Sequence, residues 1–233
     1  MRGKLVIGHR GAPSIMVENS LEGIVEALRL GADGVEVDVR ATKDGSLVAF
    51  HDRSLLRVLG VNRLVSEVEL DELRGLGRTR GFTVPTVEEV LEVVVGKAMI
   101  VLDVKELRAV RSLIELLRRD GGGEVVVSSF DHRIPLMVKR EVPWAEAGII
   151  LSARPLSLSG LLHEEVDHLF LKKDYVDLEL LEEAQSFEVP VHAWVVNDEE
   201  EAKHLWSMGV CGVVTDAPQL LVSGRRIHGP SVQ

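Results

Sequence analysis

Ionisable residues stand at or just after the ends of short apolar runs in this 233-residue sequence. His9 and Arg10 follow the run LVIG, Glu36 and Asp38 alternate with valines in GVEVDV, and Asp103 follows MIVL. Side chains alternate between the two faces of a β-strand, so Glu36 and Asp38 point to the same side. Imidazole, guanidinium and carboxylate groups gathered at strand ends are suited to acid/base catalysis and anion binding.

Three carboxylates gathered in one partly buried site need a neutralising cation. Glu36, Asp38 and Asp103 would repel one another there. Oxygen ligands without thiolates favour Mg²⁺ or Ca²⁺, so we predict a hard divalent cation at this place. The structural alternative is a set of ordinary ion pairs, Glu36 with Arg10 and Asp103 with Lys105.

The two histidines His9 and His51 are better suited to proton transfer than to metal binding, because histidine is an uncommon ligand of hard cations. Arg10 and Lys105 are not needed by the metal, and their cationic groups suit an anionic substrate such as a phosphate. A site with a metal, two imidazoles and two cationic side chains is typical of phosphoryl-transfer chemistry.

A hairpin is expected to bring His51 to the carboxylates. The run LVAFH follows GVEVDV too closely for a helical crossover, and KDG between them suits a turn. A turn over residues 43–45 places His51 opposite Glu36 or Asp38, on the face that their carboxylates share.

Strand and helix patterns alternate along the whole sequence. Strands that are apolar on both faces, each followed by a helix, predict a parallel sheet covered by helices. About eight such units predict an α/β fold of the TIM-type (β/α)8 barrel class, with the hairpin partner as the ninth strand and the active site at the carboxyl ends of the strands. Two helix starts resemble capping boxes, Asn19 with Glu22 and Thr86 with Glu89. The candidate strands are KLVIGH, GVEVDV, LVAFH, AMIVLDV, EVVVSSF, AEAGIIL, HLFLKK, VHAWVV and GVVTD.

Composition and length indicate one domain, 1–233, in which the polar, glycine-containing segment of about 53–84 is an insertion over one end of the barrel. The net charge of -10 with scattered basic residues argues against a nucleic-acid partner. No apolar stretch approaches the roughly 20 residues of a membrane helix, so we expect no stable membrane insertion. Cys211 is the only cysteine and no secretory pattern is present, which favours a cytoplasmic protein. The sequence predicts no particular oligomeric state.

Taken together, the motifs resemble the glycerophosphodiester phosphodiesterase family. The matching text runs in order through HRGAPSIMVENS, GADGVEVDVRATKDGSLVAFHD, VPTVEEVL, LDVK, VSSFD, HAWVVND and GVVTDAP. The resemblance implies a TIM-type barrel that hydrolyses a small-molecule glycerophosphodiester to an alcohol and sn-glycerol 3-phosphate with the help of a divalent metal ion.

The resemblance also implies a role for each matching residue. The metal ligands would be Glu36, Asp38 and Asp103, and the acid/base pair would be His9 and His51. The phosphate would be bound by Arg10 and Lys105. Supporting and pocket residues would be Glu18 and Asn19, which brace the site, and Trp194, which lines the glycerol pocket.

Three positions depart from the usual text of the family. Asp103 stands where a glutamate is usual, so the resemblance does not predict whether Mg²⁺ or Ca²⁺ is preferred. Val17 replaces a proline before Glu18, and Val195 replaces a threonine after Trp194. None of these changes removes a proton-transfer group.

Three alternative functions remain on the sequence alone. A lysophospholipase D acting on monoacyl lipids would need an apolar groove, which the segment 53–84 could supply. A related barrel phospholipase would need a docking surface, and no aromatic or basic amphipathic patch predicts one. A non-catalytic phosphate- and metal-binding barrel is favoured slightly by Asp103 and opposed by the intact His9 and His51, and turnover discriminates it from an enzyme.

Overall fold

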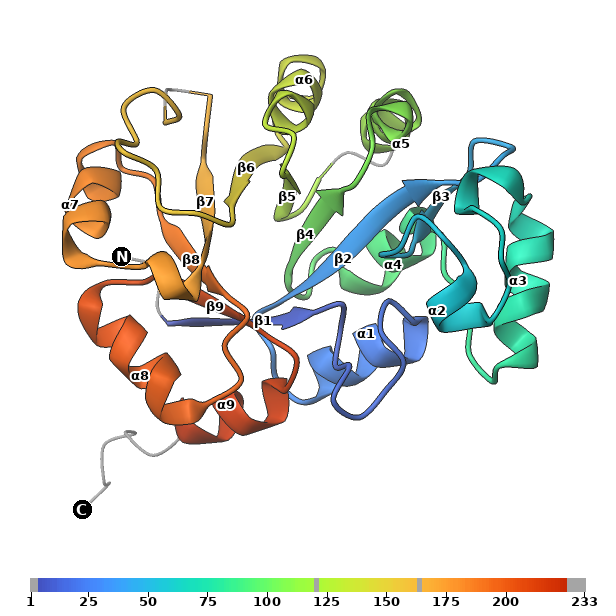
Figure 1. Ribbon diagram of the computed structural model, residues 1–233, viewed down its shortest axis with the longest axis horizontal. Coiled ribbons are helices and arrows are strands. Elements are labelled where there is room, and N and C mark those ends of the chain that lie inside the picture. The colour runs from blue at the N-terminus through green and yellow to red at the C-terminus, as the bar shows by residue number, and fades with distance from the viewer. Residues whose placement is uncertain (1–3, 120–121, 163–164, 226–233) are drawn as a thin grey trace.

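Eight parallel strands close into a barrel, and helices surround it on the outside (Figure 1). The computed structural model describes residues 4–119, 122–162 and 165–225. The barrel strands are β1 Leu5–His9, β2 Gly34–Ala41, β4 Met99–Val104, β5 Val125–Ser129, β6 Glu146–Leu151, β7 His168–Lys172, β8 Val191–Trp194 and β9 Gly212–Thr215. Strand β1 pairs with both β2 and β9, which closes the sheet. The expectation of a TIM-type (β/α)8 barrel is confirmed.

Helices cover the outer face of the barrel, and side-chain caps begin several of them. The capping box of Thr86 and Glu89 is confirmed, since each side chain accepts a hydrogen bond from the other residue's backbone N–H. At the first helix the expectation was wrong by one residue, because Ser20 Oγ accepts from Gly23 N at 3.0 Å and is the cap instead of Asn19. The helices around the barrel are α1 Leu21–Arg29, α4 Val87–Val94, α5 Val110–Arg119, α6 Arg133–Glu141, α7 Leu178–Ser186, α8 Glu199–Met208 and α9 Pro218–Arg225. Short 3₁₀ turns, Leu107–Ala109 and Lys173–Tyr175, follow β4 and β7.

Alternate residues of the strands belong to two different cores. Side chains such as Val37 pack with the helices in the layer outside the barrel, while Ile7 and Val101 belong to a separate cluster that fills its interior. Because Glu36 and Asp38 alternate with the outward valines of β2, they share the interior side. The alternation therefore directs both carboxylates into the barrel, near the carboxyl end of β2.

Strand β3, Leu47–Ala49, forms the expected antiparallel hairpin with β2, but in another register. Val39 pairs with Ala49, so the prediction that His51 lies opposite Glu36 or Asp38 was wrong by one residue. The reason is the length of the turn. The connection 42–46 has an odd number of residues between the paired ends, whereas the predicted register requires an even number. His51 instead approaches the site from the loop after β3.

The segment expected as an insertion, 53–84, contains a short helix α2 Leu56–Leu59, a 3₁₀ turn Val65–Glu67 and a helix α3 Leu70–Thr79. Its apolar side chains form a small core with Val48 and Phe50 of the hairpin. Figure 1 shows α2 and α3 beside β3 at one side of the barrel. This core fixes α2 against the hairpin that leads to His51.

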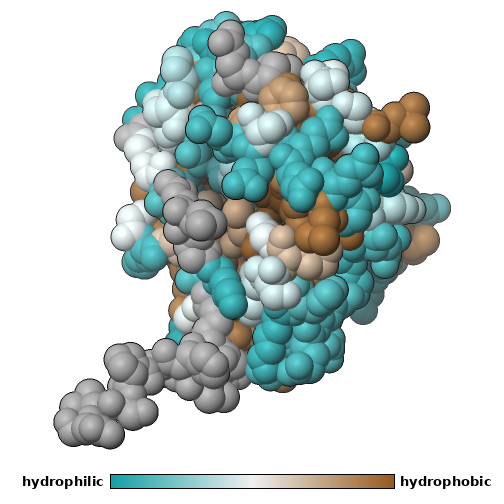
Figure 2. Space-filling model, turned by 90° about the vertical axis from the view of Figure 1, so that its left-hand side faces the viewer, coloured by the Kyte–Doolittle hydropathy of each residue, from teal (hydrophilic) through white to brown (hydrophobic). Residues whose placement is uncertain are grey.

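Hydrophilic side chains predominate on the face shown in Figure 2, and hydrophobic ones form small patches there. Among residues 4–119, 122–162 and 165–225, no helix combines the length and the apolar character that crossing a bilayer requires.

Candidate active site

The side chains expected to do chemistry meet at the carboxyl ends of the barrel strands. In the parallel register, His9 pairs with Glu36, and Asp38 pairs with Asp103. A pocket opens over them, and its polar and aromatic lining is made by His9, Arg10, Glu36, His51, Asp103, Lys105, Ser128, Phe130, Phe170 and Trp194. Strands far apart in the sequence thus supply one site.

Glu36, Asp38 and Asp103 form a buried carboxylate cluster. One oxygen of each lies within 4.8 Å of the others. Burial, and then the neighbouring Asp38 carboxylate, raises the pKa of Glu36 to about 7. Burial also raises the pKa of Asp103, because it outweighs the attraction of the Lys105 ammonium. The cluster is therefore short of positive charge.

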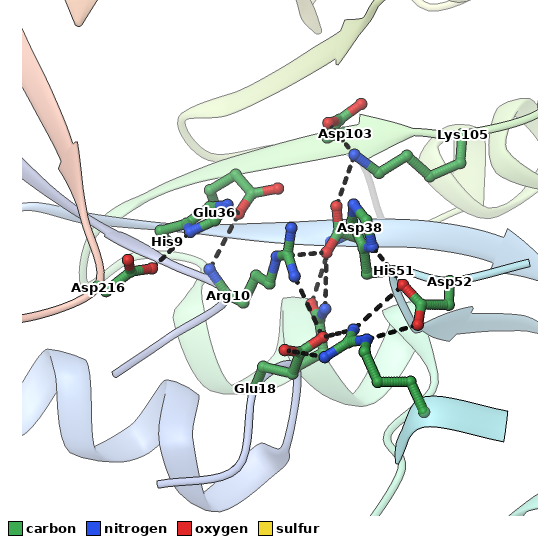
Figure 3. Close-up of polar contacts among 12 residues, drawn as sticks. His9, Arg10, Glu18, Glu36, Asp38, His51, Asp52, Asp103, Lys105 and Asp216 are labelled. Atoms are coloured by element: carbon green, nitrogen blue, oxygen red, sulfur yellow. Dashed lines mark hydrogen bonds and ion pairs between the residues drawn. The ribbon is translucent and has the colours of Figure 1, made fainter. Parts of the chain in front are cut away.

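Two cationic side chains flank Asp38 within this cluster (Figure 3). Lys105 Nζ lies 2.6 Å from Asp38 Oδ1 and also pairs with Asp103, while Arg10 Nε lies 3.0 Å from Asp38 Oδ2. Burial opposes ionisation of Asp38, but Lys105 and Arg10 outweigh it and hold its pKa below the ordinary value. With every group ionised, three negative charges face two positive ones, which leaves one negative charge uncompensated.

The chain turns sharply after β1 to place Arg10. Arg10 has φ 53°, in the left-handed region, and Gly11 follows with φ 90°. A Cβ at Gly11 would lie 2.7 Å from the backbone carbon of Gly23, so only glycine fits between the strand and α1. The turn lets Arg10 N donate to Glu36 Oε2 at 2.9 Å. The HRG sequence is thus explained by local geometry together with the charge it delivers.

His9 is held by a carboxylate on the neighbouring strand end. Its Nδ1 lies 2.7 Å from Asp216 Oδ1, and its Nε2 lies 3.9 Å from Glu36 Oε2. Asp216 is held in turn by Asn197, whose Nδ2 donates to Asp216 Oδ2 at 2.8 Å. Burial lowers the pKa of His9, but Asp216 and Glu36 outweigh it, so the pKa is raised.

His51 has a corresponding carboxylate partner. Its Nδ1 lies 2.6 Å from Oδ1 of Asp52. Arg57 of α2 donates to Asp52 through Nε at 2.6 Å and to Glu18 through Nη1 at 2.9 Å. The hydrogen bonds from Arg57 lower the pKa of Asp52 to about 2, so this carboxylate stays ionised. Glu18 also accepts from Arg10 Nη1 at 3.2 Å, which joins both sides of the site through Arg57.

Asn19 contacts the metal-site candidate Asp38 directly. Its Nδ2 donates to Asp38 Oδ2 at 2.7 Å, and Asp38 N donates to Asn19 Oδ1 at 3.1 Å. These two bonds explain why Asn19 is unavailable as a helix cap. They fix the orientation of the Asp38 carboxylate within the cluster.

Part of the pocket lining is aromatic. Phe130 and Trp194 pack edge to face, with their ring centroids 5.7 Å apart. Trp194 Nε1 is buried and has no hydrogen-bond partner within the described part of the chain. The pocket thus has aromatic side chains beside its charged groups, with Lys105 Nζ 5.9 Å from the centre of the Phe130 ring.

Comparisons with known proteins identify the family of this chain. A family model described as the glycerophosphoryl diester phosphodiesterase family matches residues 9–220. The chain belongs to this family. The barrel is accordingly that of a phosphoric diester hydrolase that acts on glycerophosphodiesters.

Relatives from several bacteria resemble the chain over nearly its whole length. A glycerophosphodiester phosphodiesterase of Caldanaerobacter subterraneus is 29% identical over 94% of this chain and 96% of its own. A phosphodiesterase of Oleispira antarctica, solved in complex with the product sn-glycerol-3-phosphate, has a TM-score of 0.87 at 26% identity and covers 95% of this chain and 96% of its own. A glycerophosphodiester phosphodiesterase of Thermotoga maritima has a TM-score of 0.83 at 28% identity, with 97% and 100% coverage.

The carboxylate cluster of this family member fits a hard divalent cation. All its donors are carboxylate oxygens, which Mg²⁺ and Ca²⁺ prefer. Asp103 Oδ1 is buried and accepts no hydrogen bond among the described residues. A bound cation would compensate the excess negative charge of the ionised cluster and could take an oxygen that has no hydrogen-bond partner.

Sequence reasoning assigned no role to Asp216, Asp52 or Arg57. Two of them stood within matched motifs, HD after the hairpin and TDAP after β9, but the motifs did not reveal which ring nitrogen each carboxylate holds. Two features of the sequence could have identified the aspartates. Asp52 directly follows the candidate catalytic residue His51, and Asp216 stands at the end of the strand that closes the barrel beside His9.

Proposed function

We propose that this hydrolase cleaves glycerophosphodiesters to an alcohol and sn-glycerol 3-phosphate by proton transfer through His9 and His51, at a site that holds one divalent cation, Mg²⁺ or Ca²⁺. The observation that carries the proposal is that two imidazoles, each held at Nδ1 by an aspartate, line one pocket with a buried carboxylate cluster. The proposed ligands of the cation are Glu36, Asp38 and Asp103.

Proton transfer is assigned to the Nε2 atoms of the two histidines, because the aspartates hold their Nδ1 atoms. One Nε2 accepts the proton of the attacking hydroxyl, either the glycerol hydroxyl next to the ester or a water. The other donates a proton to the oxygen of the leaving alcohol as its bond to phosphorus breaks. Asp216 and Asp52 stabilise the imidazolium that forms on each side.

Arg10 and Lys105 are assigned to the phosphate. Each of them pairs with a different oxygen of Asp38. A bound phosphate would therefore share the guanidinium and the ammonium with the Asp38 carboxylate. A bound divalent cation supplies further positive charge to the phosphoryl oxygens and lowers the pKa of a hydroxyl beside it.

The charge balance supports a diester as the substrate. When Glu36, Asp38 and Asp103 are all ionised, they exceed Arg10 and Lys105 by one negative charge. A divalent cation would turn this into one excess positive charge, which a phosphodiester with one negative charge would balance. A phosphate monoester product, with about -1.5 to -2 charge at pH 7, exceeds this balance, which favours its release.

The remaining pocket residues are assigned to substrate fit. Trp194, with its free Nε1 donor, would line the glycerol pocket, and Glu18 and Asn19 brace Arg10 and Asp38. Most apolar side chains of the segment 53–84 pack into its own core, which does not favour that segment as an acyl groove, although Leu56 is exposed. A cytoplasmic location and the absence of a nucleic-acid partner stay predictions.

The test is release of glycerol 3-phosphate by the purified protein from glycerophosphocholine and glycerophosphoethanolamine, after EDTA treatment and after Mg²⁺ or Ca²⁺ is restored. Metal-dependent release is expected, with a loss of about 10²–10⁴ in rate for His9→Ala and for His51→Ala. Near-full activity in both variants contradicts the proposed roles. Faster cleavage of lysophosphatidylcholine than of either water-soluble diester would favour the lysophospholipase D alternative.

A further inference from the structure

Three oxygen-bearing side chains stand in one row across neighbouring strands of the barrel. Asp38 of β2 pairs with Asp103 of β4, and Asp103 pairs with Ser128 of β5. Paired residues of parallel strands point to the same face, and neighbouring strands lie about 4.8 Å apart. The hydroxyl of Ser128 therefore stands beside the Asp103 carboxylate, on the side away from Asp38.

Ser128 lacks the partner that a buried hydroxyl ordinarily has. Its side chain is 0% exposed, and its Oγ makes no hydrogen bond within residues 4–119, 122–162 and 165–225. Asp103 Oδ1 is likewise buried without a partner there, and both residues line the same pocket. Unpaired buried oxygens are rare and costly, so two on neighbouring strands indicate a ligand that both would hold.

The next position in the row offers Ser128 no polar neighbour. Gly148 of β6 pairs with Ser128 and has no side chain. A ring carbon of Phe170 lies 2.8 Å from where a Cβ at Gly148 would stand, so an aromatic ring fills that place. Within the row, the polar side chain next to the Ser128 hydroxyl is that of Asp103, and the two make no hydrogen bond with each other.

The adjacent serine is different. Ser129 Oγ donates to the carbonyl oxygen of Val104 at 2.7 Å, and Ser129 also accepts from Asp131 N at 3.1 Å. Its hydroxyl is fully used in the structure. Ser129 therefore serves as a matched control for removal of a buried hydroxyl at the end of β5.

We propose that Ser128 is a fourth oxygen donor of the divalent-cation site, acting beside Asp103. The inference rests on the proposed function, because it takes the carboxylate cluster as the cation site. Asp103 has a side chain one methylene shorter than that of Glu36, which sets its carboxylate closer to the barrel wall where Ser128 stands. A hydroxyl adds an oxygen without adding to the three negative charges already gathered, which suits a hard cation that takes six or more oxygens.

The experiment titrates MgCl₂ and CaCl₂ separately into the EDTA-treated, dialysed full-length protein and measures the dissociation constant by calorimetry. Ser128→Ala is expected to weaken binding about 10–100-fold, the size of effect typical for a residue that supports a metal site. Ser129→Ala is expected to leave the affinity unchanged. Melting temperatures measured in EDTA show that each variant is folded before the cation is added.

A second background tests whether Ser128 acts together with Asp103. In Asp103→Glu, the longer carboxylate reaches further into the cluster, so the hydroxyl is needed less. Adding Ser128→Ala to Asp103→Glu is expected to cost much less affinity than it does in the wild-type protein, a non-additivity that independent sites do not show. An equal cost in both backgrounds overturns the joint role.

The outcomes separate this inference from the proposed function. Wild-type protein that binds neither cation overturns the cation part of the proposed function and this inference with it. Wild-type binding that is unchanged in Ser128→Ala, or weakened equally in Ser129→Ala, overturns the role of Ser128 alone. If Ser128→Ala is unfolded in EDTA, Ser128→Cys of similar volume replaces it, because sulfur is a poor ligand for hard cations, and wild-type affinity in that variant also overturns the proposal.

Discussion

The Nδ1 atom of His9 lies 2.7 Å from Oδ1 of Asp216, the residue that follows strand β9. Strands β1 and β9 are neighbours in the closed barrel although they lie at opposite ends of the sequence. Closure of the barrel therefore supplies the carboxylate that orients this imidazole. Asn197 holds the second oxygen of Asp216, which fixes the pair in one geometry.

Replacing Asp216 should change the pH dependence of the reaction. The carboxylate raises the pKa of His9 against the opposing effect of burial, so Asp216→Asn should lower that pKa. The limb of the pH–rate profile that His9 governs should move to lower pH, and kcat should fall by roughly 10–100-fold, less than the loss of His9 itself would cost. If the acidic limb moves, His9 is the base, and if the alkaline limb moves, it is the acid.

The matched control for this prediction is Glu115→Gln, which removes an exposed carboxylate paired with Arg111 on the outer helix α5. Its profile should overlay that of the wild type. A wild-type rate and profile in Asp216→Asn would show that the carboxylate does not act on His9 during turnover.

Arg57 should matter for activity more than for stability. It is half-exposed, and exposed ion pairs contribute only about 0–1 kcal/mol to stability. It nevertheless contacts Asp52, which holds His51, and Glu18, which holds Arg10. Arg57→Ala is expected to lower kcat/KM by about 10–100-fold through misplacement of both groups. Arg57→Lys should recover only part, because one ammonium lacks the fork that serves two carboxylates.

Steady-state kinetics with Arg53→Ala as the control checks this prediction. Arg53 is exposed and lies in the same segment, so its removal takes away the same charge. For Arg57→Ala, kcat should fall and KM should rise, because Arg57 supports both a proton-transfer group and a phosphate-binding group. Equal effects of the two arginine variants would indicate a general charge effect instead.

The fold and most of the site were predictable because strand alternation is a local property. The valines of GVEVDV determine which side Glu36 and Asp38 occupy, and no tertiary contact is needed to deduce it. The same holds for the strand ends that present His9 and Asp103. Once eight parallel strands are expected, the carboxyl end of the barrel follows as their meeting place.

The errors arose where a long-range contact competes with a local pattern. Asn19 matches a helix cap, yet a buried bond to Asp38 on another strand takes its side chain, and Ser20 caps the helix. The hairpin register depended on one residue of turn length, which the sequence KDG does not determine. The role of Arg57 depends on a separate small core that places α2, so no short motif could reveal it.

Adding a divalent cation should raise the melting temperature of the EDTA-treated protein. A ligand that binds only the folded state at about 100 times its dissociation constant stabilises by about 2.7 kcal/mol, or roughly 5–10 °C for a domain of this size. Glu36→Gln should reduce this shift strongly, because it removes one of three clustered carboxylates while its amide oxygen still accepts from Arg10 N.

Differential scanning calorimetry with and without MgCl₂ or CaCl₂ measures the shift. Glu115→Gln, at an exposed position on α5, is the control and should keep the full shift. A shift of the same size in Glu36→Gln would mean that the stabilising cation binds somewhere other than the cluster.

His192 should make the barrel sensitive to acid. It is buried inside the barrel, where its Nε2 lies 3.0 Å from His168 Nδ1, and burial followed by the neighbouring His168 lowers its pKa to about 3. The unfolded chain binds a proton near pH 6.5 and the folded protein does not, so stability falls as the pH drops below 6.5. The slope is about 1.4 kcal/mol per pH unit, or roughly 2 kcal/mol between pH 6.5 and 5.

Urea unfolding of wild type and His192→Gln at pH 7, 6 and 5 measures this contribution. The glutamine keeps a neutral polar group beside His168 but takes up no proton, so the free energy of unfolding of the variant should fall by about 2 kcal/mol less over this range. His204→Gln, at an exposed position of α8, should retain the wild-type slope. Parallel pH dependence in His192→Gln and the wild type would show that another group takes up the proton that destabilises the fold.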